Sequence, residues 1–288
     1  MKPILIYSHP KEPITQVLLS SFFCEKRGGL AISIEKFIAK VDVYDEFDES
    51  SVRICWHDRD SGTKIYNTHE YYLINRILSL PEACFNNFSS TDRAFVAAEY
   101  KSYFLFAMQS FPFCFVKPGP FGLSGNRFSL PRQWDMVKHA KLKNRVCVPN
   151  FYLGNILLCD LKKNIVYSDP NNFYFWKPNK EVQKKYCFAF ERPTGLPVIG
   201  SVIGDEINIF CYHSNDFIEE EKTAKISNIL KELMKVFDCS NMLEFLIFVD
   251  SEKVSFGMMN TLLFASKNKA WFIDCVISFF DKEMKIKI

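Results

Sequence analysis

The first part of the chain alternates between short apolar runs and a stretch with helical spacing. Residues 3–10 read PILIYSHP, a β-branched and aromatic run closed by His-Pro, which predicts a buried strand. Apolar positions in residues 15–29 recur with a helical period, and Thr15 and Gly28 suit the start and the end of such a helix. Residues 30–37 alternate as a strand does. We therefore expect the chain to open as a β-α-β unit with parallel strands.

Longer periodic segments follow this unit. Residues 90–111 contain neither Gly nor Pro and predict a long helix. A second long helix is predicted over 216–240, where Glu and Lys recur four residues apart, and a shorter one over 131–144, with an early proline. Apolar runs predict the remaining strands, which lie at 51–58, at 145–155, within 186–213, at 242–250 and at 269–280.

Composition narrows the class of protein. Among 288 residues, 48% are hydrophobic and 24% are charged, which is typical of a globular protein with a sizeable core. The chain has 36 Lys and Arg against 33 Asp and Glu, a net charge of +3, which is too balanced for a nucleic-acid-binding surface. No apolar segment approaches the ~20 residues that a membrane helix needs. We expect no binding to nucleic acid and no membrane segment.

Ten cysteines are scattered along the chain, and no CxxC pair occurs among them. This spacing excludes a zinc ribbon. Most of them have apolar neighbours, which favours buried, reduced thiols over a framework of disulfides. The apolar run at the N-terminus is far too short for a secretory signal. We therefore expect a cytoplasmic location.

Six local patterns occur in an order that is informative as a set. They are ILIYS near the start, ICWHDRD at 54–60, FVAAEYKSYFLFAM at 95–108, the stretch from PGPFGLSG to FYLGN at 118–155, FAFERPTGLPVIGSVIGDEI at 188–207 and WFIDCVISFF at 271–280. In this order they resemble the ATP-grasp superfamily, in its branch of ribosomal-peptide maturases, the graspetide-type ligases. The resemblance extends over nearly the whole chain.

The resemblance implies an α+β fold with three parts. An N-terminal α/β pre-ATP-grasp domain is expected over 1–117, a linker helix with a shortened middle or lid subdomain over 118–187, and a C-terminal ATP-grasp domain over 188–288. The same resemblance implies ATP and Mg²⁺ as cofactors. It also implies a precursor peptide or a partner protein as binding partner, and leaves a homo-oligomer open.

The resemblance implies an enzyme that phosphorylates a carboxylate with ATP. An amine or hydroxyl then attacks the resulting acyl phosphate. Lys177, at the end of a strand, and Arg127, in GNRF, match phosphate-contacting positions, and Glu191 matches an acidic residue that meets the nucleotide. Lys177 and Glu191 are equally compatible with exposed strand ends, and Arg127 with the capping of a turn. The glycines before Arg127 do not have the spacing of a Walker-type phosphate loop.

Asp274 matches a metal-binding carboxylate in the D-x-N-x-x-P pattern of the family's last strand. A single Asp within an apolar run is costly to bury without a partner or a metal ion, so this site is the sharpest in the sequence. A second metal carboxylate would be Glu244 or Asp250. The peptide-binding residues are not indicated by any pattern.

Three departures from the family pattern favour another interpretation. Val276 stands where the pattern places the metal-binding asparagine, and Ile199 where it places an arginine. Residues 155–186, where a glycine-rich lid is expected, contain no glycine. Each loss could raise the reaction barrier by about 3 kcal/mol, as removed electrostatic donors do. The alternative is a catalytically degenerate ATP-grasp-fold protein that binds a peptide or partner enzyme without ATP chemistry, so the sequence leaves enzyme activity open.

Overall fold

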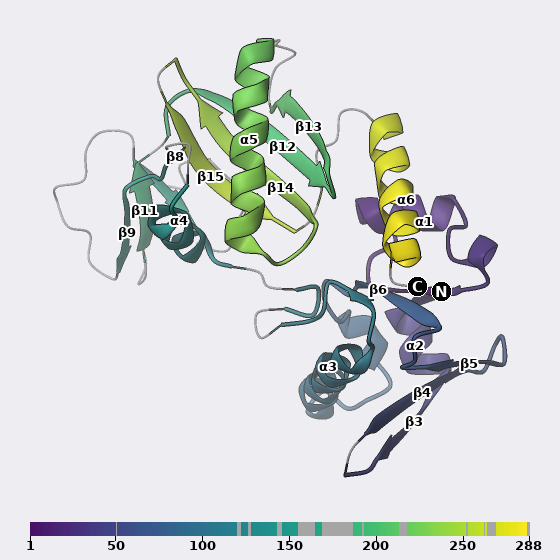
Figure 1. Cartoon of the computed structure of the whole chain (residues 1–288). Coiled ribbons are helices and arrows are strands. Elements are labelled where there is room, and N and C mark those ends of the chain that lie inside the picture. The colour runs from purple at the N-terminus through teal and green to yellow at the C-terminus, as the bar shows by residue number, and fades with distance from the viewer. Residues whose placement is uncertain are drawn as a thin grey trace. The chain divides into compact units, whose positions relative to one another are not determined.

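The computed structural model describes residues 1–49, 51–119, 122–125, 128–142, 146–154, 165–168, 187–191, 193–212, 218–251, 253–261, 263 and 269–286. The chain divides into two compact units (Figure 1). Unit 1 contains residues 1–126 and 268–288, and unit 2 contains residues 127–267. This grouping differs from the expected three-part division, because the C-terminal segment joins the N-terminal unit.

Unit 1 contains a four-stranded sheet in the order β2-β1-β6-β7. All its pairs are parallel, and β1 lies between β2 and β6, so the predicted parallel opening is confirmed. The bounds of these strands are β1 Lys2–Tyr7, β2 Leu30–Ser33, β6 Tyr71–Arg76 and β7 Cys114–Phe115.

The opening unit has a shorter first helix than the sequence pattern predicts, and a second helix that the pattern did not predict. Helix α1 is Pro13–Ser20, and Glu12 caps it by accepting hydrogen bonds from backbone N–H groups of its first turn. Ser33 ends β2 and caps α2, Ile34–Lys40, through the backbone N–H of Lys36. The strand predicted over 30–37 is therefore wrong in its second half, because a good cap diverts the chain into a helix.

A second sheet of unit 1 has the order β3-β4-β5 and is antiparallel throughout. Helix α3 packs against it, and Trp56 of β4 donates a hydrogen bond to Tyr103 of this helix over 2.6 Å. The predicted long helix is thus confirmed. The bounds are β3 Val41–Phe47, β4 Val52–Asp58, β5 Thr63–Tyr66 and α3 Asp92–Ser110, with short 3₁₀ helices at Glu25–Arg27 and Glu82–Phe85.

The segment predicted as the last strand is a helix, α6, Lys269–Ile286. Its buried residues are Phe272, Val276, Phe279, Phe280 and Met284. Their spacing of three and four residues is that of one helix face, and a run of apolar residues cannot by itself distinguish such a helix from a buried strand. The helix packs in unit 1, where the Phe280 and Phe115 rings lie 4.9 Å apart.

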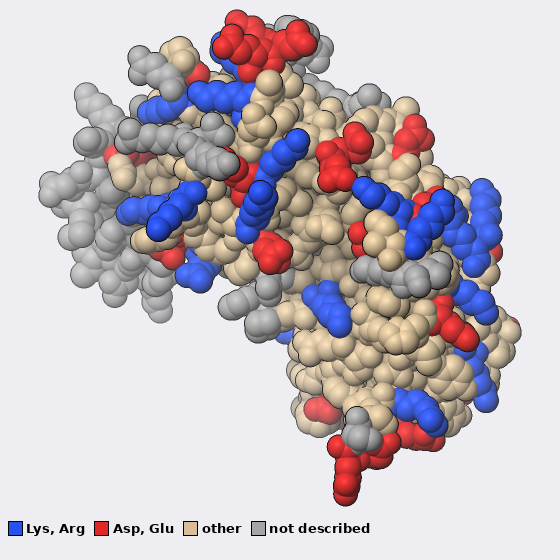
Figure 2. Space-filling view, in the orientation of Figure 1, with Lys and Arg blue, Asp and Glu red and all other residues tan. Residues whose placement is uncertain are grey.

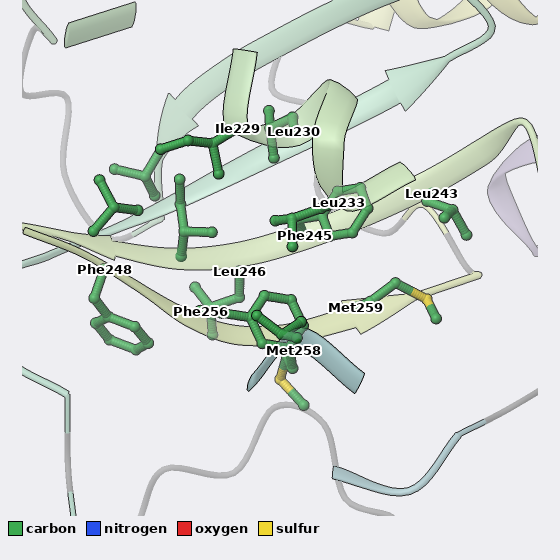
Figure 3. Close-up of a cluster of buried hydrophobic side chains, with 14 of the residues drawn as sticks. Ile229, Leu230, Leu233, Leu243, Phe245, Leu246, Phe248, Phe256, Met258 and Met259 are labelled. Atoms are coloured by element: carbon green, nitrogen blue, oxygen red, sulfur yellow. The ribbon is translucent and has the colours of Figure 1, made fainter. Parts of the chain in front are cut away.

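Unit 2 is built on a five-stranded sheet in the order β13-β12-β14-β15-β8. Helix α5, Glu220–Phe237, lies on one face and buries Ile229, Leu230 and Leu233 against the sheet (Figure 3). The long helix and the strands predicted at 145–155, within 186–213 and at 242–250 are confirmed, whereas the sequence pattern did not predict β15. The strands are β8 Val146–Cys147, β12 Leu196–Ile203, β13 Glu206–Cys211, β14 Met242–Val249 and β15 Val254–Asn260.

A small antiparallel sheet of unit 2 has the order β10-β11-β9. The chain reaches it through helix α4, Leu130–His139, and the buried Trp134 of this helix lies 5.1 Å from the Phe190 ring of β11. The bounds are β9 Phe151–Gly154, β10 Ile165–Ser168 and β11 Cys187–Glu191. Most of the expected lid, residues 155–186, lies outside the described residues.

Two sequence-based expectations concern the described residues as a whole. Eight of the described cysteines are free thiols, but only Cys24, Cys55 and Cys211 among them are buried, and burial raises the pKa of the Cys24 thiol to about 12. No helix in the described part of the chain is long and apolar enough to cross a bilayer.

Candidate functional site

The two faces of the unit 2 sheet differ in what covers them. A Cβ atom added to Gly200 of β12 would overlap the Leu230 side chain of α5, so Gly200 faces this helix. Side chains alternate between the faces of a sheet, so Ile199 and Ser201 point to the other face. Figure 3 shows Leu246 and Met258 on this opposite face as well.

A row of three polar residues crosses the face opposite α5. Ser201 of β12 is directly opposite Glu244 of β14, and Glu244 is directly opposite Asn260 of β15. The Ser201 hydroxyl lies 3.3 Å from Glu244 Oε2 as a hydrogen-bond donor. Ser201 and Glu244 have no exposed surface, so this carboxylate needs compensating partners. We call Ser201, Glu244 and Asn260 the polar row.

A second row lies two residues further along the same strands and is entirely apolar. Ile199 is directly opposite Leu246, and Leu246 is directly opposite Met258. All three side chains are at most 2% exposed. This apolar row offers no hydrogen-bonding group or charge to a ligand.

Thr261 follows Asn260 directly and is buried, and within the described part of the chain its Oγ1 has no hydrogen-bond partner. A buried hydroxyl without a partner is uncommon and favours a ligand or water beside it. The polar row by itself brings together hydroxyl, carboxylate and amide oxygens, a set of hard oxygen donors around one carboxylate. Such a set suits Mg²⁺, which commonly takes one or two carboxylates and completes its shell with phosphate oxygens and water.

The described residues do not form a metal site from protein ligands alone. No group of three or more His, Cys, Asp or Glu residues that could hold a metal ion occurs among them. A metal ion beside Glu244 would therefore need ligands other than a cluster of described His, Cys, Asp or Glu residues.

The end of β15 beside the polar row is held by helix α4. The Gln133 side chain accepts a hydrogen bond from the Met259 backbone N–H over 2.6 Å and donates one to the Met259 carbonyl oxygen over 3.1 Å. Trp134 Nε1 donates to the Gly257 carbonyl oxygen over 2.6 Å. The Gln133 side chain thus takes the place of a neighbouring strand at this end of β15 and pairs with both backbone groups of Met259.

Of the residues predicted to contact nucleotide, Arg127 and Lys177 lie outside the described residues. Glu191 lies at the end of β11, where Asn150 Nδ2 donates to its Oε2 over 2.9 Å and its backbone N–H donates to the Asn150 carbonyl oxygen. The Glu191 carboxylate thus has a protein partner, and its nucleotide role stays a prediction.

The structure places Asp274 differently from the expectation. It is exposed on helix α6 of unit 1, so it is not the buried strand carboxylate that made this site the sharpest in the sequence. Val276 is buried on the same helix, so it does not replace a metal-binding asparagine of a last strand. Of the two alternatives for a second carboxylate, Glu244 is in the polar row, whereas Asp250 lies beyond the other end of β14.

No family model matches the chain, and no curated protein matches its sequence. Solved structures match it over nearly its full length. The macrocyclase MdnC bound with precursor peptide MdnA, from Microcystis aeruginosa MRC, matches 97% of this chain and 98% of its own, with a TM-score of 0.69 and 15% identity. A RiPP-associated ATP-grasp ligase of Chryseobacterium gregarium, in complex with ADP and a leader and core peptide, matches 98% and 97%, with a TM-score of 0.64 and 11% identity.

A third structure is the ATP-grasp ligase PsnB complexed with minimal precursor, Mg and ADP, which matches 97% of this chain and 98% of its own, with a TM-score of 0.60 and 12% identity. The chain has the ATP-grasp fold. The α+β class and the ATP-grasp resemblance inferred from the sequence are therefore confirmed as statements about the fold.

In this ATP-grasp-fold protein the last described strand is β15, and it ends in Met258-Met259-Asn260. Within this strand Met258 and Asn260 have the spacing of the aspartate and the asparagine in the D-x-N pattern expected on the last strand. The sequence patterns missed this because the apolar run at 271–280 contains an Asp. A usable signal was the largely apolar run 254–259, which ends in Asn260.

Proposed function

We propose that this chain is a peptide maturase: it binds a ribosomally made precursor peptide and uses ATP to activate a side-chain carboxylate for ester or amide cross-linking. The observation that carries the proposal is the polar row, which puts Glu244 beside Asn260 and Ser201 in the unit 2 sheet. The proposal is supported by solved structures of the same fold that contain precursor peptides together with ADP.

In the proposed reaction a carboxylate oxygen of the peptide attacks the γ-phosphorus of ATP, ADP leaves and an acyl phosphate forms. A hydroxyl or amine of another side chain then attacks the carbonyl carbon, phosphate leaves, and the proton of the nucleophile passes to solvent. Bound Mg²⁺ supplies charge neutralisation at the phosphates. Glu244 and Asn260 would hold this ion, and Arg127, Lys177 and Glu191 would contact the nucleotide.

The test is calorimetric titration of the full chain with a non-hydrolysable ATP analogue, with and without Mg²⁺. Glu244→Gln removes the carboxylate and keeps the side-chain shape. It should weaken Mg²⁺-dependent binding roughly tenfold or more, the scale of a lost contact to a charged group worth about 1.5–3 kcal/mol. Asp274→Asn is the matched control, because Asp274 is exposed on α6. Thermal unfolding of each variant checks that it remains folded.

The outcome decides between two sites. Weakened binding in Glu244→Gln with unchanged binding in Asp274→Asn supports the site proposed at the polar row. The reverse result would return the metal site to Asp274 and contradict the role of Glu244. Equal, Mg²⁺-independent binding by all three proteins would contradict both sites.

A second candidate function is favoured by the apolar row. Ile199 stands where the family pattern has an arginine, and Met258 has the spacing of its aspartate, so this row lacks charged groups that a phosphoryl transfer uses. The second candidate is a non-catalytic ATP-grasp-fold protein that binds a peptide or a partner enzyme. It predicts no binding of the ATP analogue at millimolar concentration, but retention of a short peptide encoded beside the gene.

A further inference from the structure

Strand β3 of unit 1 has an unprotected outer edge. It pairs with β4 from Val41 to Phe47 in unbroken register, and no other strand of the described residues pairs with its outer side. Edge strands are commonly protected by charged side chains, above all lysine, by proline or by a bulge, and the charged residues of β3 are all acidic. Strand β3 reads VDVYDEF, so it contains neither lysine nor proline, and its pairing shows no register shift. Its outer backbone groups can therefore pair with an added strand.

Large apolar side chains on this strand are exposed to solvent. Tyr44 is 58% exposed and Phe47 is 65% exposed, and the Phe47 ring lies 5.5 Å from that of the half-exposed Phe106 on α3. Exposed aromatic side chains along an open strand edge are typical of surfaces that bind extended peptides. They add contact area to the backbone hydrogen bonds.

The charge on this hairpin determines which partner fits. Between residues 41 and 53 the chain has five acidic residues, and Arg53 is the single basic one. Figure 2 shows acidic side chains gathered at the end of this hairpin, at the bottom of the view. A second copy of β3 would bring acidic residues opposite acidic residues, which destabilises strand pairing. A basic strand would be complementary.

We propose that the outer edge of β3 binds an extended peptide segment with a basic, apolar, basic pattern at alternate positions. Asp42, Tyr44 and Glu46 alternate with the residues between them and so share one face of the strand. Basic side chains of the added strand lie opposite the two acids, and its apolar side chain lies opposite Tyr44.

The present partners of the two acids do not prevent this. Arg59 Nε lies 3.5 Å from Asp42 Oδ1, and these side chains are 52% and 36% exposed. Arg53 Nη1 lies 2.9 Å from Glu46 Oε2, and both side chains are about 70% exposed. Exposed ion pairs contribute little, roughly 0–1 kcal/mol, so an incoming basic side chain can exchange with Arg53 or share the carboxylate.

The proposed binding needs no nucleotide and uses no residue of unit 2. The proposed binding is therefore independent of the ATP-dependent function, and either proposal can be wrong without the other. Peptide binding at β3 without ATP binding would support this proposal alone, and ATP binding without peptide binding at β3 would support only the proposed function.

The experiment uses the full chain without nucleotide and a fluorescein-labelled peptide that contains Lys-Thr-Val-Thr-Lys. Binding is followed by fluorescence anisotropy at low and high ionic strength, and a matched peptide has Glu in place of both Lys. Glu46→Lys should weaken binding of the basic peptide roughly fivefold or more. Glu206→Lys is the control, because Glu206 is an exposed acid on β13, the edge strand of the unit 2 sheet. Amide hydrogen exchange should show protection of β3.

Four results would overturn the proposal: equal binding of the acidic and basic peptides, absence of saturable binding, equal loss in Glu206→Lys, or unchanged exchange in β3. Sedimentation gives a further check. A dimer of the wild type that is lost in Glu46→Lys would assign the edge to a second copy of the chain and contradict the proposal. Saturable, salt-sensitive binding with protection of β3 in a monomer would support it.

Discussion

Arg76 Nη2 lies 2.6 Å from Glu12 Oε1, and both side chains are almost completely buried. Arg76 ends β6, and Glu12 caps α1 by accepting hydrogen bonds from the backbone N–H and the hydroxyl of Thr15. A second bond, from Arg76 Nε to Glu12 Oε2, makes the pair bidentate. This pair therefore joins the first helix of unit 1 to its parallel sheet with a fixed geometry.

Replacing one member of this pair should be strongly destabilising. Arg76→Met leaves the Glu12 carboxylate buried without its cation, and loss of one partner of a buried pair costs about 3–5 kcal/mol. Arg53→Met removes the exposed bridge to Glu46 and should change stability by less than about 1 kcal/mol. Urea unfolding of both variants measures the difference. Equal stability of the two variants would show that the buried pair contributes no more than the exposed one.

The same pair predicts how stability depends on pH. Burial alone raises the pKa of Glu12, but the Arg76 charge and the hydrogen bonds outweigh it and hold the pKa below the ordinary 4.5. The stabilising contribution of a carboxyl with a lowered pKa is complete above that value and is lost as pH falls through the folded-state pKa. The free energy of unfolding should therefore fall below pH 4.5, and less steeply in Glu12→Gln. Parallel pH profiles of the two proteins would contradict this prediction.

The close contact between Gly200 and Leu230 predicts that added volume at position 200 lowers the stability of unit 2. Because the missing Cβ of Gly200 faces Leu230, Gly200→Ala should overpack the core and cost about 1–3 kcal/mol. Leu230→Val removes bulk at the same contact, so the double variant should be less destabilised than the sum of the single variants. Thermal unfolding of the four proteins measures the coupling, and strict additivity would show that the two positions do not compete for space.

Replacement of Phe280 tests whether helix α6 packs in unit 1. The buried Phe280 ring lies 4.9 Å from Phe115 and 6.0 Å from Phe23, both in unit 1. Phe280→Ala should cost about 3–5 kcal/mol of stability. Amide hydrogen exchange should increase in β1 and β6 and stay unchanged in β14. Increased exchange confined to β14 would instead support a C-terminal domain over 188–288.

Much of the architecture can be predicted from local sequence pattern. The absence of Gly and Pro identifies α3, and Glu and Lys four residues apart identify α5. Alternating or continuous apolar runs identify β1, β4 and β14, because these patterns follow from strand geometry. The order of weak motifs identifies the ATP-grasp fold. These signals are local, and they survive even though identity to the matched structures is only 10–15%.

Local pattern could not decide which apolar run forms a strand of a sheet and which forms a helix that packs on a core. The run at 271–280 is compatible with either, and only packing against Phe115 makes it a helix face. For that reason the sequence alone placed the metal carboxylate at Asp274. The alignment of Ser201, Glu244 and Asn260 depends on strand register between segments about 40 and 16 residues apart, which is set by long-range hydrogen bonding. The sequence alone indicated the ATP-grasp fold and most of its elements through local pattern. The tertiary structure, through long-range packing and pairing, decided that the run at 271–280 is a helix and which polar residues lie side by side.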